Sequence, residues 1–170
     1  MERNGLLLEE KEFSRISPDD VAIAQFYQKY GSSVLIIRHG TAVARCADEL
    51  ADQVGAPICR EALYAAGQLH DMVRYLPDHA AACAKILTES GYPDVGAIVA
   101  THHDLPEEAG IENCLLYLAD KLVQEDQRVS LQWRFEQARR KCRTAQAVAA
   151  WEKRYQRACR IVETLHLNLK

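Results

Sequence analysis

The sequence predicts an all-α protein, an orthogonal bundle of about seven helices with a helical extension at its C-terminal end. Two observations indicate this fold class. Apolar residues recur at helical spacing through most of the chain, and no alternating strand pattern of any length occurs. The chain of 170 residues suits one domain with a substantial core. We expect a lead-in over residues 1–16, a helical domain over 17–126, and an extension over 127–170 packed on that domain.

The first helix is predicted to begin at Ser17-Pro18-Asp19-Asp20. Ser17 would be its N-cap and Pro18 its first helical residue, with acidic side chains in the first turn where the helix dipole favours them. Gly31 is expected to end this helix just after Tyr30.

The second helix is expected to start after a cap at Ser32 or Ser33 and to run to Gly55. The β-branched run that begins at Val34 would by itself also suit a strand. The helical spacing of the apolar residues that follow it favours a helix, and His39 belongs to the same inward-facing stripe.

The remaining helices follow from the same spacing and from glycine and proline at their boundaries. We expect them over residues 61–70, 79–91, 93–102 and 111–123, followed by two more from Ser130 onward.

Charge is distributed unevenly along the chain. From Asp71 to Glu125, three Lys and Arg residues face ten Asp and Glu residues, a balance of 3 − 10 = −7. From Asp126 to Leu169 the balance is 10 − 4 = +6. The acidic middle also holds most of the histidines, so it should attract cations, and no nucleic-acid partner is expected. The basic C-terminal segment is typical of a solvated helix face, with a phosphate-bearing substrate or an acidic partner left open.

The compartment is expected to be the cytoplasm. No apolar run approaches the roughly 20 residues that would cross a bilayer, and the N-terminus soon turns acidic, so neither a membrane nor a secretion signal is expected. Six scattered cysteines without a C-x-x-C pair indicate reduced thiols rather than a zinc-thiolate site.

The candidate site rests on histidines. Five of the six fall within residues 39–103. A single histidine on an apolar helix face is usually a core residue, but here several lie on separate helices. Two acids accompany them, one directly after a histidine and one alone in an apolar helix, where an ionised carboxylate needs a partner or a metal. These candidates are His39, His70, Asp71, His79, His102 and Asp120.

Neutral imidazoles and carboxylates together suit Mn, Fe, Co, Ni or Zn rather than Ca. Either one or two ions are expected. The first would be held by His39, His70, Asp71 and Asp120, and the second by His79 and His102, with Asp71 bridging. Paired ions hold a phosphoryl oxygen and lower the pKa of a bridging water, which supplies a nucleophile at neutral pH.

The order His…His-Asp…Asp over roughly residues 30–125 resembles the HD-domain metal-dependent phosphohydrolases. The segments that carry the resemblance are His39-Gly-Thr-Ala-Val-Ala-Arg-Cys-Ala, Ala65-Ala-Gly-Gln-Leu-His-Asp, His79-x-x-x-Cys-Ala-Lys-Ile-Leu, Ile98-Val-Ala-Thr-His-His-Asp and Tyr117-Leu-Ala-Asp-Lys-Leu. The resemblance implies the HD-domain helical bundle and hydrolysis of a phosphate ester, often of a nucleotide.

The resemblance also implies site roles. His79 and His102 match the extra histidines of the two-metal subgroup, and His103 then either contacts the ligands without binding their ion or is itself a ligand of a third metal. His-Asp-Met-Val-Arg74 stands where many members have His-Asp-Ile-Gly-Lys, so Arg74, or else Lys121, is expected to bind phosphate. No Gly-Tyr-Pro motif follows the His-His-Asp segment, which argues against cyclic-dinucleotide cleavage.

Three other functions stay open. An HD-fold di-iron oxygenase would use the same ligands, and a non-catalytic module would bind metal or nucleotide without turnover. Arg38-His39-Gly40-Thr41 is similar to the motif of the histidine phosphatases, but those enzymes need an α/β sandwich, and this reading leaves Asp71 and Asp120 unexplained. The substrate is expected to be a small phosphate ester, and the C-terminal helices either pack on the bundle or form a homodimer face.

Overall fold

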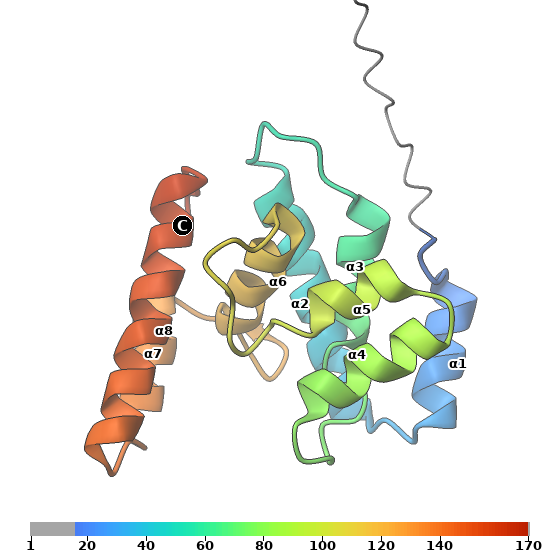
Figure 1. Ribbon diagram of the computed structural model, residues 1–170, viewed down its shortest axis with the longest axis horizontal. Helices are drawn as coiled ribbons and strands as arrows, with labels where there is room; N and C mark the ends of the chain where they lie inside the picture. The colour runs from blue at the N-terminus through green and yellow to red at the C-terminus, as the bar shows by residue number, and fades with distance from the viewer. Residues whose placement is uncertain (1–15, 170) are drawn as a thin grey trace, which may run out of the picture.

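The computed structural model describes residues 16–169, and in this range the protein is an all-α bundle with one very small sheet. The helices of this range, labelled in Figure 1, are α1 (Asp20–Lys29), α2 (Val34–Ala51), α3 (Arg60–Leu69), α4 (His79–Glu89), α5 (Pro93–Val99), α6 (Ile111–Lys121), α7 (Leu131–Arg139) and α8 (Ala145–Thr164). The predicted fold class is confirmed. The expected lead-in over 1–16 lies, except for Ile16, outside the described residues.

Helix starts follow side-chain capping. The Asp19 carboxylate accepts a hydrogen bond from the Ala22 amide at 2.8 Å, so Asp19 is the N-cap of α1 and the expected cap at Ser17 was wrong. Serine and aspartate are equally good N-caps, so the sequence alone does not choose between them. Ser33 caps α2 as expected, through its hydroxyl and the Ile36 amide, and Gly31 takes a positive φ of 62° directly after the end of α1.

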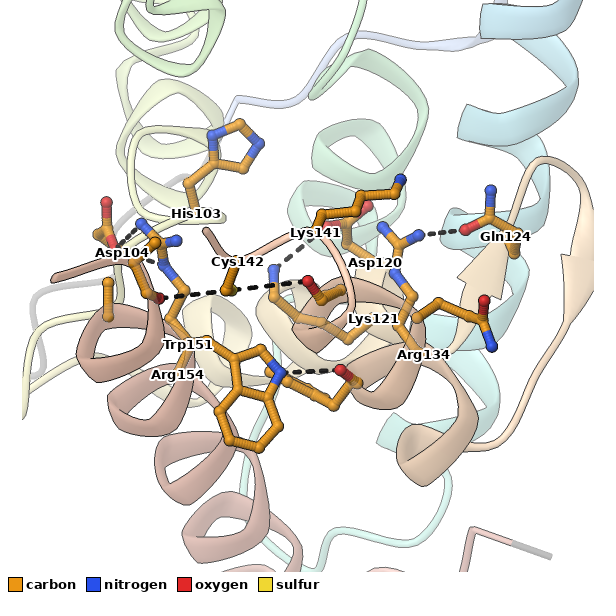
Figure 2. A pocket seen from close by; sticks show the side chains of 15 residues that line it. His103, Asp104, Asp120, Lys121, Gln124, Arg134, Lys141, Cys142, Trp151 and Arg154 are labelled. Carbon is orange, nitrogen blue, oxygen red and sulfur yellow. Dashed lines mark hydrogen bonds and ion pairs between the residues drawn. The ribbon is translucent and has the colours of Figure 1, made fainter. Parts of the chain in front are cut away.

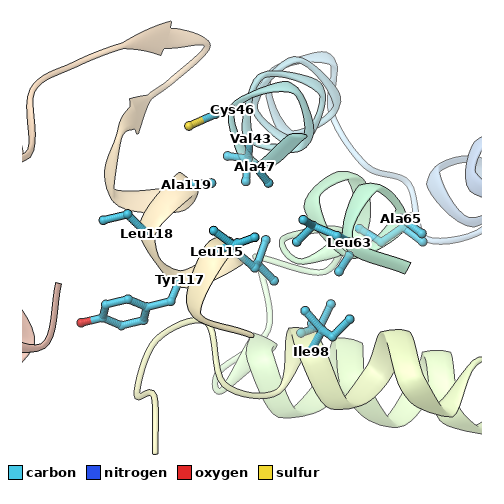
Figure 3. Close-up of a cluster of buried hydrophobic side chains, with 14 of the residues drawn as sticks. Val43, Cys46, Ala47, Leu63, Ala65, Ile98, Leu115, Tyr117, Leu118 and Ala119 are labelled. Atoms are coloured by element: carbon cyan, nitrogen blue, oxygen red, sulfur yellow. The ribbon is translucent and has the colours of Figure 1, made fainter. Parts of the chain in front are cut away.

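The core lies between α2, α3, α5 and α6, whose apolar faces meet in one cluster (Figure 3). Two glycines let α2 and α3 approach closely. A Cβ added at Gly67 would lie 2.6 Å from Cα of Ala44, and one at Gly40 would lie 2.3 Å from the carbonyl oxygen of Gln68. Because His39 precedes one glycine and His70 follows the other by three residues, this close packing also brings the two histidines together.

A short β-hairpin follows α6, with β1 (Val123–Gln124) paired antiparallel to β2 (Gln127–Arg128). The sequence predicted helix as far as Val123, whereas α6 ends at Lys121. Strands of two residues are too short to produce an alternating pattern, so no sequence signal marked the hairpin. Its turn residue Glu125 has a φ of 56°, in the left-handed region.

Helices α7 and α8 lie side by side at one edge of the molecule (Figure 1). The Trp151 indole donates a hydrogen bond to the Phe135 carbonyl at 2.8 Å, which joins the two helices. The Tyr117 hydroxyl donates to the Arg154 carbonyl at 3.0 Å, which joins α8 to α6. The pair therefore packs against the helix that carries Asp120. The boundaries assigned to the domain and its extension stay predictions.

Among residues 16–169, no helix combines the length and the apolar character needed to span a membrane. All six cysteines are free thiols, and Cys46 and Cys83 are buried.

Candidate metal centre

Seven side chains from five helices or their ends meet at one place. His39 lies within α2, His70 is the residue that ends α3, and His79 is the first residue of α4. The other members are Asp71, which follows α3, His102 and His103, which follow α5, and Asp120 in α6. His102 was expected inside a helix over 93–102, but α5 ends at Val99. The chain turns there because the His102 amide already bonds to the Val99 carbonyl, three residues back.

Backbone carbonyls orient three of the imidazoles. Nδ1 of His39 lies 2.6 Å from the Glu125 carbonyl oxygen, and Nδ1 of His70 and of His102 each lie 2.8 Å from the carbonyl three residues before them. A carbonyl only accepts hydrogen bonds, so Nδ1 carries the proton in each ring. Nε2 is then left with a lone pair that points into the cluster, as in a metal-ligating histidine.

Asp71 lies at the centre of the cluster, and its two carboxylate oxygens face different histidines. Oδ2 is 3.8 Å from His39 Nε2 and 3.7 Å from His70 Nε2. Oδ1 is 2.9 Å from His79 Nε2 and 3.7 Å from His102 Nε2. One carboxylate therefore joins two groups of histidines.

Asp120 completes the group on the α2 side. Its Oδ1 lies 3.3 Å from His39 Nε2 and 3.5 Å from His70 Nε2. Its Oδ2 accepts a hydrogen bond at 3.2 Å from Lys121, whose ammonium also donates to the His102 carbonyl at 2.8 Å. Lys121 is buried, and through these two hydrogen bonds it connects Asp120 of one histidine group with His102 of the other.

Donor atoms form two sets that suit a metal ion. In each set the potential ligand atoms all lie within 4.8 Å of one another; one set is His39, His70 and Asp120, and the other is Asp71, His79, His102 and His103. Within residues 16–169, Nε2 of His70 and of His102 is buried and has no hydrogen-bond partner. Nε2 of His79 is also buried and lies 2.9 Å from Asp71 Oδ1. Buried polar atoms nearly always have partners. These unpartnered lone pairs, together with the adjacent carboxylates, fit a divalent cation.

The electrostatics favour the metal-binding form of both carboxyls, of His102 and of His103. Burial raises the pKa of both carboxyls, but His70 opposes it at Asp71, Lys121 and the histidines oppose it at Asp120, and both pKa values fall below the usual range. Burial lowers the pKa of His102, and burial together with His102 lowers that of His103 to about 4. Ionised carboxylates and neutral imidazoles are the forms that bind metal.

Burial also lowers the pKa of His70, but the charges of Asp71 and Asp120 outweigh it, so the net shift is upward. The carboxylates on both sides of this imidazole thus attract positive charge to the position that a cation would take.

A pocket of about 170 Å³ opens over the cluster. Arg74 lies at its mouth, 59% exposed, with Nη1 3.2 Å from Asp71 Oδ2. Four lining residues were not singled out from the sequence: Val123, Gln124 and Glu125 from the hairpin, and Arg134 from α7. Glu125 acts through its backbone carbonyl, a group that every residue carries, so no sequence signal could have indicated it.

Comparison with known proteins agrees with this geometry. A family model described as HD domain matches residues 36–124, just over half of the chain. No curated protein and no solved structure matched the chain. HD domains are in general those of metal-dependent hydrolases, and the clustered His and Asp side chains lie within the matched residues. The chain belongs to the HD-domain family.

Proposed function

We propose that the protein is a metal-dependent phosphohydrolase that cleaves a phosphomonoester or phosphodiester, of a nucleotide by preference, with a metal-activated water. The observation that carries this proposal is the position of Asp71, with one carboxylate oxygen toward His39 and His70 and the other toward His79 and His102. A carboxylate in this position can bridge two cations.

The proposed ligands divide accordingly. His39, His70 and Asp120 would hold one divalent ion, and His79 and His102 the other, with Asp71 shared. His103 is more exposed than His102, and its ring centroid lies 4.1 Å from that of His102, which supports a place at the open side of the second ion. Mn, Fe, Co, Ni and Zn all accept this mixture of nitrogen and oxygen ligands.

When bound, the ions would supply a water of lowered pKa as nucleophile and would withdraw charge from the phosphoryl oxygens. The protein's own residues would do the rest. Arg74 lies at the open side of the pocket with its guanidinium beside Asp71, so it is suited to hold a phosphate oxygen next to the ligands. The buried walls formed by His70 and His102 exclude bulk water from that side.

Lys121 was expected as a phosphate-binding alternative to Arg74. Its ammonium already donates hydrogen bonds to Asp120 and to the His102 carbonyl, and it lies 4.1 Å from the centroid of the Tyr117 ring. These contacts support a positioning role, in which Lys121 holds one ligand from each group.

The test is reconstitution of the purified chain. Protein stripped with a chelator should regain hydrolysis of an aryl phosphate, and of members of a panel of nucleotide mono- and diesters, on addition of Mn, Fe, Co, Ni or Zn. Metal analysis of the same samples should show ions bound in proportion to activity. Full activity in chelator would contradict the proposal.

The same samples separate the two other HD-type functions. Iron-dependent colour with oxygen uptake and no phosphatase activity would indicate a di-iron oxygenase. Tight metal or nucleotide binding without turnover across the panel would indicate a non-catalytic module.

A further inference from the structure

A second, larger cavity lies beside the metal-binding cluster. Its volume is about 540 Å³, within the range of small-molecule sites. One wall comes from α6 and the turn after α5, and the other from α7, α8 and the residues between them (Figure 2). Most of its lining therefore lies outside residues 36–124, the part of the chain that matches the HD domain.

The two cavities adjoin each other. His103, Asp120, Gln124 and Arg134 line both of them. Arg134 projects from α7 and donates a hydrogen bond to the Gln124 side chain, which holds its guanidinium at the junction. A molecule whose phosphate lies over the metal ligands would extend past Arg134 into the larger cavity.

Positive charge in the larger cavity is only partly compensated. Its two carboxylates are already paired, Asp104 with Arg154 at 2.9 Å and Asp120 with Lys121 at 3.2 Å. Arg134 and Lys141 line the same cavity, and neither forms an ion pair with any of the described residues 16–169. Two cations without carboxylate partners beside one cavity favour an anionic ligand.

One wall of the larger cavity is apolar. Phe135, Ala138, Ala147, Ala150 and Trp151 form the wall between the two C-terminal helices. A bare inorganic anion would leave this wall exposed to water, whereas an organic group would cover it.

We propose that the C-terminal helices build a specificity subsite, and that the substrate is an organic phosphate with a second anionic group. The scissile phosphate would lie over the His and Asp cluster, the organic body against the wall at Ala150 and Trp151, and the second anion between Arg134 and Lys141. This inference rests on the proposed phosphohydrolase function, and it assigns substrate selection to the segment beyond the HD match.

The experiment measures binding by isothermal titration calorimetry with the Mn-loaded full-length chain. Two probes that resist phosphatase action are compared: phenylphosphonate, which has one anionic group, and adenosine 5′-(α,β-methylene)diphosphate, which has two. The diphosphate analogue should bind at least tenfold more tightly than phenylphosphonate. Lys141→Met and Ala150→Glu should each weaken its binding about tenfold or more. Neither substitution removes a buried core side chain, and thermal melts check that both variants fold.

Lys153→Met is the matched control, because Lys153 is an exposed lysine of α8 that does not line the cavity. It should bind both probes as the unchanged chain does. Equal affinity for the two probes, or a diphosphate affinity that neither cavity variant changes, would overturn the subsite. Turnover of phosphate esters with these binding results would leave the proposed function intact and remove only the subsite. Tighter binding of the diphosphate analogue without turnover of any phosphate ester would leave the subsite intact and contradict the proposed function.

Discussion

At the scale of single residues, Asp71 determines the character of the site. Four imidazoles lie within 3.8 Å of its two oxygens, and no other side chain of the cluster faces both histidine groups in this way. Asp120 contacts only one group, and His103 belongs only to the other. Asp71 is therefore the candidate ligand whose own carboxylate joins the two groups.

Asp71→Asn should abolish this coupling while it keeps the size of the side chain. We expect metal affinity and phosphatase turnover to fall by on the order of 100-fold or more, because changes to mere supporting partners of metal ligands already cost about 10–100-fold. Metal titration and steady-state kinetics measure both effects. Asp20→Asn, at an exposed position on α1, is the control. Metal binding and turnover that are unchanged in Asp71→Asn would remove Asp71 from the site.

At the scale of elements, the contact between α2 and α3 sets the position of two ligands. Gly67 packs against the backbone of Ala44, and its carbonyl accepts the hydrogen bond from His70 Nδ1. The same residue thus serves the packing of the helices and the orientation of a ligand.

Gly67→Ala should destabilise the protein by about 1–3 kcal/mol, the usual cost of overpacking, although alanine is the better helix former. It should also weaken metal binding, because α3 has to move away from α2. Denaturant unfolding and metal titration measure the two effects. Gly55→Ala is the control, since a Cβ there meets nothing within 4 Å. Equal stability of the two variants would show that the close approach is not required.

The hairpin between α6 and α7 supports His39, because the Glu125 carbonyl accepts the hydrogen bond from His39 Nδ1. Glu125 is the first of its two turn residues, and a positive φ there is the type II′ arrangement, in which glycine is the usual residue. The hairpin is held by the pairing of Val123 with Arg128, and Asp126 forms an ion pair with Arg38 of α2.

Glu125→Pro should disrupt this support, because proline fixes φ near −65°. The carbonyl would then leave His39 Nδ1, and metal affinity should fall roughly 10–100-fold, as for other partners of ligating histidines. Glu125→Gly keeps the turn and should retain the metal affinity. Calorimetric titration with Mn distinguishes them, and equal affinity of the proline and glycine variants would contradict the role of this carbonyl.

At the scale of the whole molecule, burial makes two thiols and a tyrosine hydroxyl of the core harder to ionise than in the unfolded chain. Burial raises the pKa of Cys46 to about 12, that of Cys83 to about 11 and that of Tyr117 to about 12. The unfolded chain loses the thiol protons near pH 9, whereas the folded chain keeps them. Their stabilising contribution is therefore complete below pH 9 and is lost as the pH rises toward the folded values.

The free energy of unfolding should fall by on the order of 2–4 kcal/mol between pH 8 and pH 10.5. Denaturant titrations at a series of pH values measure this fall. Cys83→Ala should flatten the dependence, because it removes one of the protected thiols. A free energy of unfolding that stays constant over this range would show that the thiols ionise freely in the folded state.

Much of this architecture was predictable, because helical spacing and capping residues are local properties of the chain. The start of α2 at Val34, the start of α4 at His79 and the assembly of His39, His70 and Asp120 all agree with the sequence. The expected resemblance over residues 30–125 agrees with the matched span of 36–124.

What the sequence could not predict depends on contacts between distant segments. The cap at Asp19 rather than Ser17 is a choice between two equally good residues. The hairpin at Glu125 supports His39 through a backbone atom, and Arg134 reaches the site only because the fold places α7 so that this side chain bonds to Gln124 of the hairpin. The larger cavity is likewise a product of tertiary packing, and no local pattern records it.

The most direct test of the central claim is the rate of aryl phosphate hydrolysis by chelator-stripped protein as Mn²⁺ is added back. The proposal that the His and Asp cluster is a hydrolytic metal centre predicts no turnover without metal and a saturable rise as the ions bind. That rise should be absent from Asp71→Asn. Hydrolysis that persists in excess chelator, or metal binding that never produces turnover of any phosphate ester in the panel, would contradict it.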